Sequence, residues 1–157
     1  MKIRNMVILA VLAAVVLVFL SGCDMCAPRE PLNADVFLEV MESEGYEVID
    51  VLYENEGMAE AFNTFLVVIG EDYRFEFAEF AAEEYAITAF ASAQAYIESA
   101  RGATRSYRQV NLANYSLFEQ TSAGAFAYVY RVDNAILRVN SDVEYSPHVR
   151  TLLDRIR

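Results

Sequence analysis

The 157-residue sequence contains one lysine, one histidine, two cysteines and no tryptophan. The lysine is Lys2, so residues 23–157 contain no lysine amine. That absence excludes Schiff-base chemistry and a P-loop from this part of the chain, because both depend on a lysine. Glycine is also sparse, and beyond residue 22 it occurs only at five isolated positions. A glycine-rich loop that holds a phosphate group is therefore excluded as well.

The single histidine, His148, stands in the first turn of the last helix that the sequence predicts. No second histidine, paired cysteine or ligand-spaced carboxylate accompanies it, so a zinc site has little support. The calcium loop pattern D-x-D-x-D-G is missing too. No serine has an evident base partner other than His148, and the sequence has no G-x-S-x-G motif. We therefore expect no metal site and no catalytic residue, with His148 on the surface of its helix.

Acidic residues are abundant and unevenly placed. After residue 22 the chain has 23 acidic residues against 10 arginines, a formal charge of −13. Residues 23–84 hold 17 of the acids and two arginines, whereas residues 85–157 hold six acids and eight arginines. Such a domain is repelled by nucleic acid, which we exclude as a partner, and by bare anionic lipid headgroups. The acidic half is most simply a solvated face; the alternative is a surface for a basic partner or for divalent cations.

The first 22 residues have the pattern of a bacterial lipoprotein signal peptide. Lys2 and Arg4 give a positive start, and residues 6–20 are an uninterrupted apolar run, shorter than the ~20 residues of a spanning helix. The next stretch resembles the bacterial lipobox: Leu20, Ser21, Gly22 and Cys23. The resemblance implies that the signal peptidase recognises the first three and cleaves before Cys23. It also implies a diacylglyceryl lipid on the Cys23 thiol, and we expect no other cofactor.

The leader leaves two alternatives, an uncleaved transmembrane anchor and an ordinary secreted protein. Both, like the lipoprotein, place the domain outside the cytoplasm, and we expect it lipid-anchored on the outer face of the cytoplasmic membrane. Cys23 and Cys26 spell C-x-x-C, but a lipidated Cys23 cannot form a disulfide and no βαβ unit surrounds the pair. We expect Cys26 to be an inert thiol; a small-thiol cap or a second acyl chain is the alternative.

Three amphipathic helices are predicted after a tether at residues 23–32. The first has Asn33 as its N-cap, Leu32 and Phe37 as a hydrophobic staple, and Gly45 at its end. The second covers residues 82–101, with small residues along its apolar stripe that would let it lie close to a sheet. The third begins with Ser146 as N-cap and Pro147 at N1.

Seven strands are predicted between these helices from β-branched and aromatic runs and from turn residues. In the third of them, Tyr73, Phe75 and Phe77 alternate with polar or small residues, which predicts one buried and one wet face. Asp133 and Asn134 form a two-residue hairpin turn. The stretch 54–63 is ambiguous between a loop and a turn of helix. The expected strands are residues 46–53, 64–69, 73–78, 105–111, 115–121, 125–132 and 135–140.

Tight turns between strands require antiparallel pairing, and helices with one apolar stripe must lie on the sheet. The sequence therefore predicts an α+β fold, a sheet of about six to seven antiparallel strands with two to three helices packed on it, in the order α-βββ-α-ββββ-α. Residues 33–157 form one domain.

Two stretches of this domain resemble small, uncharacterised lipoproteins of anaerobic gut bacteria: LNADVFLEVMESEGYEV near its start and NYSLFEQTSAGAFAYVYRVDNAILRVN near its end. This resemblance supports the fold and the lipid anchor. It adds no site residue, so the binding residues are left open.

Two further patterns bear on activity. The aromatic set of Tyr73, Phe75, Phe77 and Phe80 predicts a sheet face packed under a helix, with a binding groove as the alternative. Neighbouring acids could supply a glycosidase pair if two lay across a cleft, although adjacent acids are expected in so acidic a chain. The candidate pairs are Glu42/Glu44, Glu54/Glu56, Glu71/Asp72 and Glu83/Glu84.

These observations favour a cell-envelope lipoprotein with a non-enzymatic interaction or ligand-binding domain. Its candidate surfaces are the acidic half and any exposed strand edge, and its tyrosines suit an envelope protein, a peptide or a glycan as partner. One alternative is a hydrolase of envelope polymers that uses a carboxylate pair. Another is an accessory subunit of a membrane complex.

Overall fold

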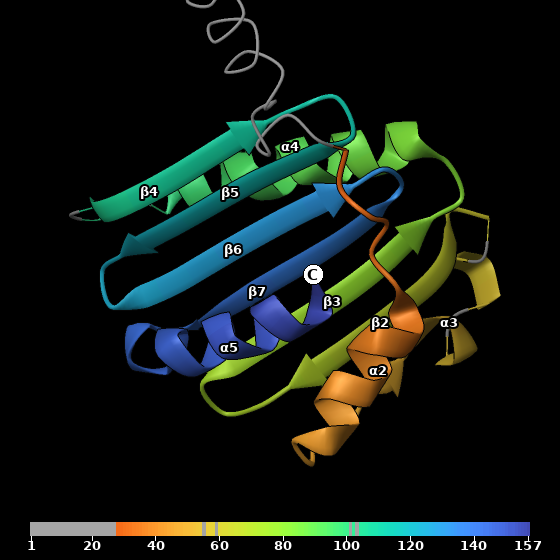
Figure 1. The fold of residues 1–157 in the computed structure, drawn as a ribbon, viewed down its shortest axis with the longest axis horizontal. Helices are drawn as coiled ribbons and strands as arrows, with labels where there is room; N and C mark the ends of the chain where they lie inside the picture. The colour runs from red at the N-terminus through yellow and green to blue at the C-terminus, as the bar shows by residue number, and fades with distance from the viewer. Residues whose placement is uncertain (1–27, 55, 59, 101, 103) are drawn as a thin grey trace, which may run out of the picture.

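The computed structural model describes residues 28–54, 56–58, 60–100, 102 and 104–157 (Figure 1). Its α-helices are α2 (Ala34–Ser43), α3 (Val51–Glu54), α4 (Glu83–Ser99) and α5 (Ser146–Ile156), and 3-10 turns cover Glu56–Met58 and Val143–Tyr145. Its strands are β1 (Ile49–Asp50), β2 (Phe62–Ile69), β3 (Tyr73–Phe80), β4 (Thr104–Asn111), β5 (Tyr115–Ser122), β6 (Ala125–Val132) and β7 (Ala135–Asp142).

The seven described strands form one sheet in the order β1-β2-β3-β7-β6-β5-β4, and every neighbouring pair is antiparallel. The α+β class and the order of helices and strands along the chain, apart from α3, agree with the prediction from the sequence. The described part of the chain has four α-helices where we expected two to three, because the short helix α3 follows β1. The pairing of β3 with β7 joins the first strands of the chain to the later meander, and it leaves β1 and β4 at the two edges.

Helices cover both faces of the sheet: α2 and α5 lie on one, the α2/α5 face, and α4 lies on the other, the α4 face (Figure 1). The larger apolar cluster, under α2 and α5, contains Phe37 and Leu152, and the smaller one, under α4, contains Phe90. On β3, Phe77 belongs to the first cluster and its neighbour Ala78 to the second. The face of β3 that we expected to be wet is therefore partly covered.

The local signals of the first helix are confirmed. The Asn33 side chain accepts a hydrogen bond from the backbone N–H of Asp35 at 2.7 Å, as an N-cap does. Leu32 and Phe37 lie in the same apolar cluster. Gly45 has a φ of +80°, which is favourable for glycine and ends the helix.

The strand predicted over residues 46–53 is wrong for most of its length. Only Ile49 and Asp50 pair with β2, and the chain then turns into α3. The cause is the Asp50 carboxylate, which accepts hydrogen bonds from the backbone N–H groups of Leu52 at 2.9 Å and Tyr53 at 3.4 Å. An aspartate at the start of a helix offers the backbone this alternative to strand pairing.

Ser146 is not the N-cap of the last helix. It is the first residue of α5, and its hydroxyl donates to the Val143 carbonyl at 2.7 Å. The turn Val143–Tyr145 runs directly into α5, so the hydroxyl bonds backward to that turn rather than forward to the helix.

Among the described residues, no helix combines the length and the apolar character that crossing a membrane requires. Both apolar clusters are built from residues between Leu32 and Ile156. A protein that starts at residue 28 therefore retains every one of these core residues.

Candidate functional site

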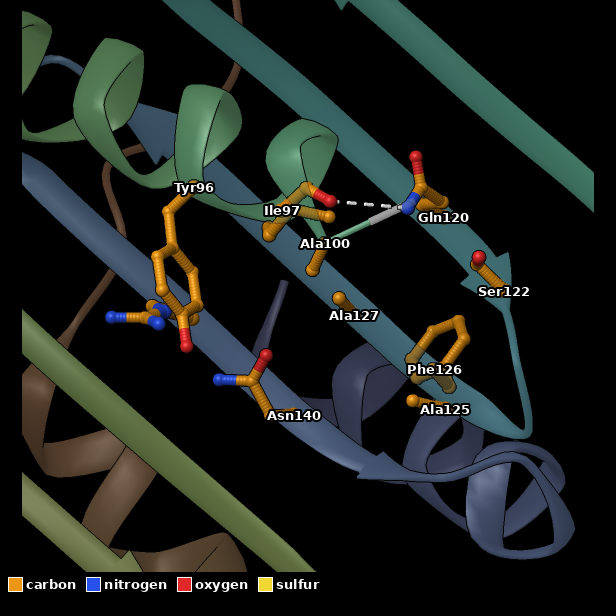
Figure 2. A pocket seen from close by; sticks show the side chains of 10 residues that line it. Tyr96, Ile97, Ala100, Gln120, Ser122, Ala125, Phe126, Ala127 and Asn140 are labelled. Atoms are coloured by element: carbon orange, nitrogen blue, oxygen red, sulfur yellow. Dashed lines mark hydrogen bonds between the residues drawn. The ribbon is translucent and has the colours of Figure 1, made fainter. Parts of the chain in front are cut away.

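The most distinctive cavity of the described structure is a hollow on the α4 face, here called the α4 pocket (Figure 2). It lies between the last turn of α4 and strands β5, β6 and β7, and its volume is about 400 Å³. Pockets of this size hold small molecules. The lining residues are Tyr96, Ile97, Ala100, Gln120, Ser122, Ala125, Phe126, Ala127, Arg138 and Asn140.

Small side chains leave the pocket open. The stripe of α4 that faces the sheet ends in Ile97 and Ala100, and the strand beneath contributes Ala125 and Ala127 (Figure 2). The sequence predicted that the small residues on this stripe would let α4 lie close to the sheet. At the C-terminal end of α4 the alanines instead leave space between helix and sheet.

Two polar side chains of β5 face this space. Gln120 is 3% exposed, and its Nε2 donates to the Ile97 carbonyl at 3.2 Å (Figure 2). The other end of the same amide, Oε1, is buried and has no hydrogen-bond partner among the described residues. Ser122 is 7% exposed, and its hydroxyl is likewise buried without a described partner.

Arg138 supplies the positive charge of the pocket. Its Nη1 lies 3.4 Å from Glu76 Oε2, and its guanidinium lies 5.7 Å from the centre of the Tyr96 ring. Glu76 also pairs with Arg74 at 2.5 Å, so one carboxylate serves two arginines. The Nε of Arg138 is buried without a described partner. This N–H is a charged donor, and such donors form strong hydrogen bonds.

Within the described residues, the buried side-chain nitrogen and oxygen atoms without a hydrogen-bond partner all belong to residues that line this pocket: Gln120 Oε1, Ser122 Oγ and Arg138 Nε. Leaving a buried polar atom unpaired costs about 1–3 kcal/mol, so natural structures rarely do so without a reason. The three atoms offer an acceptor, a hydroxyl that can donate or accept, and a donor. No carboxylate, histidine or thiol is among the residues that line the pocket.

The lipobox residues Leu20, Ser21, Gly22 and Cys23 and the second cysteine, Cys26, lie outside the described residues. Lipidation and signal-peptide cleavage therefore stay predictions.

His148 lies on the exposed side of α5, as expected, and its Nε2 is 3.0 Å from the Tyr46 hydroxyl. Among the described residues, no group of three histidine, cysteine, aspartate or glutamate side chains could hold a metal ion.

The acidic pairs named from the sequence do not line the α4 pocket. Glu44 forms an ion pair with Arg155, and Glu83 forms one with the buried Arg131. Glu71 and Asp72 lie in the turn between β2 and β3. The side chains of residues 54 and 56 lie outside the described part.

The aromatic set of β3, predicted to pack on one sheet face under a helix, does so for Tyr73, Phe75 and Phe77 but not for Phe80. Phe75 and Phe77 are buried under α2, where the rings of Phe37 and Phe77 lie 5.5 Å apart. Phe80 is buried on the opposite face of the sheet. Of the tyrosines, Tyr96 is 64% exposed and stands at the mouth of the α4 pocket (Figure 2).

Sequence reasoning named no residue of the α4 pocket as a site. A weak signal exists in β5 and β7, where Gln120 and Ser122, and Arg138 and Asn140, occupy alternate positions on one face. Alternating polar residues ordinarily indicate a face in water. Only the position of α4 over this face encloses them.

No family model matches the chain, and no curated protein matches it. One solved structure, of a GTP-binding regulator from Thermotoga maritima, is similar to the chain at 17% identity with a TM-score of 0.43. The likeness covers 82% of this chain and 90% of that one. At this TM-score the likeness assigns neither an activity nor a ligand.

Proposed function

We propose that this protein is a lipid-anchored receptor of the cell envelope that binds a small polar ligand in the α4 pocket. The observation that carries the proposal is that all three buried, unpaired polar atoms belong to residues that line one cavity. The three atoms are covered in the free protein, so a ligand reaches them by a shift of the lining side chains. A ligand that then supplies their partners regains the free energy that they cost the free protein. The lipid anchor on Cys23, inferred from the lipobox, would hold the protein at the membrane surface.

The pocket defines the chemistry of the ligand. Arg138 Nε favours an acceptor such as a carbonyl or carboxylate oxygen, and Gln120 Oε1 favours an N–H or O–H donor. The alanines and Ile97 favour an apolar face between these groups. A ligand that is neutral or carries one negative charge, with an amide and a hydroxyl, fits this combination. Soluble fragments of peptidoglycan carry both, as short peptides joined to N-acetylated sugars.

The test uses residues 28–157 and two sets of probes, soluble muropeptides and their separate sugar and peptide parts. We expect NMR signals of Gln120 and Asn140 to shift in a saturable way with at least one probe. The Ser122→Ala variant should bind that probe about three- to tenfold more weakly, since one hydrogen bond contributes about 0.5–1.5 kcal/mol. The same variant without ligand should be as stable as the wild type or more stable, because a buried unpaired hydroxyl is removed.

Ser141→Ala is the matched control. Ser141 is also 7% exposed and lies on the opposite, α2/α5 face of the sheet, but its hydroxyl has a partner, the Asp142 carbonyl at 3.1 Å. We expect this variant to lose stability and to keep its affinity. If no probe shifts the pocket signals, or if both serine variants behave alike, the receptor proposal is wrong.

The anchor has its own test, intact mass of the protein made in a bacterium that processes lipoproteins. We expect the loss of residues 1–22 and the gain of a diacylglyceryl group, both abolished in Cys23→Ser. Mature protein with an unmodified Cys23 thiol would contradict the lipid anchor and leave the pocket proposal standing.

A further inference from the structure

A second hollow lies on the α2/α5 face, beyond the end of α5, and we call it the arginine pocket. Its volume is about 340 Å³, and three arginines surround it: Arg29, Arg108 and Arg157. They come from the segment before α2, from β4 and from the residue after α5, so the fold alone brings them together. Asp154 is the one acidic side chain among the lining residues.

Arg29 is held in place through its backbone. Its N–H donates to Asn114 Oδ1 at 3.3 Å, and Asn114 Nδ2 donates back to the Arg29 carbonyl at 2.9 Å. The guanidinium lies 5.4 Å from the centre of the Tyr115 ring. This pair of hydrogen bonds fixes the segment before α2 to the turn between β4 and β5.

Arg157 is held by its side chain. Its Nε donates to the Leu153 carbonyl at 3.2 Å, and its Nη1 donates to the Tyr128 hydroxyl at 3.3 Å. Its Nη2 pairs with Asp154, and its guanidinium lies 5.9 Å from the centre of the Tyr130 ring. A guanidinium positioned in this way loses little conformational entropy when it binds an anion.

The charge of this pocket opposes that of the molecule. Three guanidinium groups face one carboxylate side chain, whereas the chain beyond residue 22 carries a formal −13. Within the described residues, Arg157 pairs with Asp154, and neither Arg29 nor Arg108 takes part in an ion pair. Glu119 lies opposite Arg108 on β5, but it pairs with Arg150. Convergent cations that outnumber their acids repel one another, and a bound anion reduces that repulsion.

We propose that the arginine pocket binds a phosphate group, either free or as part of a lipid headgroup. Arginine forks match phosphate oxygens in pairs, which favours phosphate over a smaller or spherical anion. The site differs from the α4 pocket in location and in charge, since the two lie on opposite faces of the sheet. It also lies near the proposed lipid, because Arg29 follows Cys23 by six residues.

Two arms of one experiment separate the sources of phosphate, both with residues 28–157, which retain the whole core. In the first, sodium phosphate and glycerol phosphate are titrated calorimetrically against sodium chloride of equal ionic strength. In the second, the protein is sedimented with vesicles of phosphatidylglycerol or of phosphatidylcholine. Binding in the first arm indicates a free phosphate compound, and binding only to phosphatidylglycerol indicates the headgroup. Either result supports the phosphate site.

The variant is Arg29→Gln combined with Arg108→Gln, since both side chains are exposed and the apolar clusters do not include them. We expect it to bind at least about tenfold more weakly, because two charge-assisted hydrogen-bonding groups are lost. Arg155→Gln is the control: it removes one positive charge, where the double variant removes two, from a place on α5 outside the pocket, where Arg155 pairs with Glu44. It should change the affinity less than about twofold.

The proposal fails if neither arm shows saturable binding, if the double variant binds like the wild type, or if Arg155→Gln loses binding to the same extent. The last result would mean that only overall charge matters. None of these outcomes touches the α4 pocket, whose probes and variants are different.

Discussion

Tyr128 is the largest of the fully buried side chains, and it carries a polar group into the core. Its hydroxyl accepts a hydrogen bond from Arg157 Nη1. Burial raises the pKa of Tyr128 well above its ordinary value, although the neighbouring Arg157 guanidinium acts in the opposite direction. Burial raises the pKa of Tyr46 and of Tyr130 as well. The folded protein therefore holds these phenols neutral.

We expect the free energy of unfolding to fall as the pH rises above about 10, the ordinary pKa of tyrosine. Below that pH the tyrosines are neutral in both states. Above it the unfolded chain ionises first, which favours unfolding until the folded pKa is passed. Urea denaturation at a series of alkaline pH values measures the decline. Tyr128→Phe should make it shallower, and Tyr53→Phe, at an 89% exposed position, should leave it unchanged.

Prediction from the sequence succeeded at residues that act on their own helix or turn. It failed at residues whose burial or hydrogen bonding depends on an element distant in the sequence. Asn33 and Gly45 act on their own helix, so composition and spacing identify them. Arg131 is 4% exposed because Glu83 of α4 and the Asp133 carbonyl surround its guanidinium. Ser122 lacks a partner only because α4 and β6 enclose it. No local pattern contains that information.

The hairpin between β5 and β6 turns through two residues with positive φ, Ala123 at 52° and Gly124 at 85°. Two-residue hairpin turns of this kind fit the twist of the strands and favour Asn-Gly, since asparagine and glycine tolerate positive φ. Alanine does not, because its Cβ approaches the following carbonyl. The turn therefore carries strain at Ala123.

Replacing Ala123 with asparagine should raise the free energy of unfolding by up to about 1 kcal/mol. The side chain is exposed, so the asparagine amide can extend into water. Ala123→Val is the opposing control and should lower stability, since a branched Cβ is least tolerant of positive φ. Equal thermal midpoints for the asparagine and valine variants would show that this turn is not strained.

The pairing of the elements followed from turns and periodicity, but their layering did not. The β2–β3 hairpin and the meander of β4 to β7 have the order that the turns predict. Each amphipathic helix, however, specifies only that it lies on a sheet, and either face satisfies that requirement. The α4 pocket exists because α4 packs on one face of the sheet while α2 and α5 pack on the other.

For the whole molecule, one sheet separates two apolar clusters that share every central strand. Residues next to each other on β6, such as Tyr128 and Val129, pack in different clusters. Disruption of one cluster must therefore disturb the strands that support the other.

We expect Leu152→Ala, on the buried side of α5, and Phe90→Ala, on the buried side of α4, each to lower the free energy of unfolding by about 2–5 kcal/mol. Each variant should still unfold in one transition, seen at the same urea concentration by far-UV and near-UV circular dichroism. Two separate transitions in either variant would show that the helical layers unfold independently. Ile87→Ala, at a 50% exposed position on α4, is the control and should change little.

The molecule is also divided by charge. The acidic residues 28–84 form α2 and the strands from one edge to β3, whereas β4 at the other edge lies beside the arginine pocket. An anionic bilayer therefore repels the protein least at the side of the arginine pocket. The segment before α2 lies at the same side, where Arg29 is bound to Asn114.

If Cys23 carries the proposed lipid, the two hydrogen bonds between Arg29 and Asn114 leave only a short segment between the lipid and the folded domain. From Cys23 to Arg29 the chain can extend at most roughly 20 Å. With a lipid on Cys23, the arginine pocket would meet headgroups at an effective concentration set by this length, on the order of millimolar or above. A pocket with only millimolar intrinsic affinity would then be occupied much of the time. A longer segment between Cys23 and Arg29 would lower this occupancy without altering a single contact in the pocket.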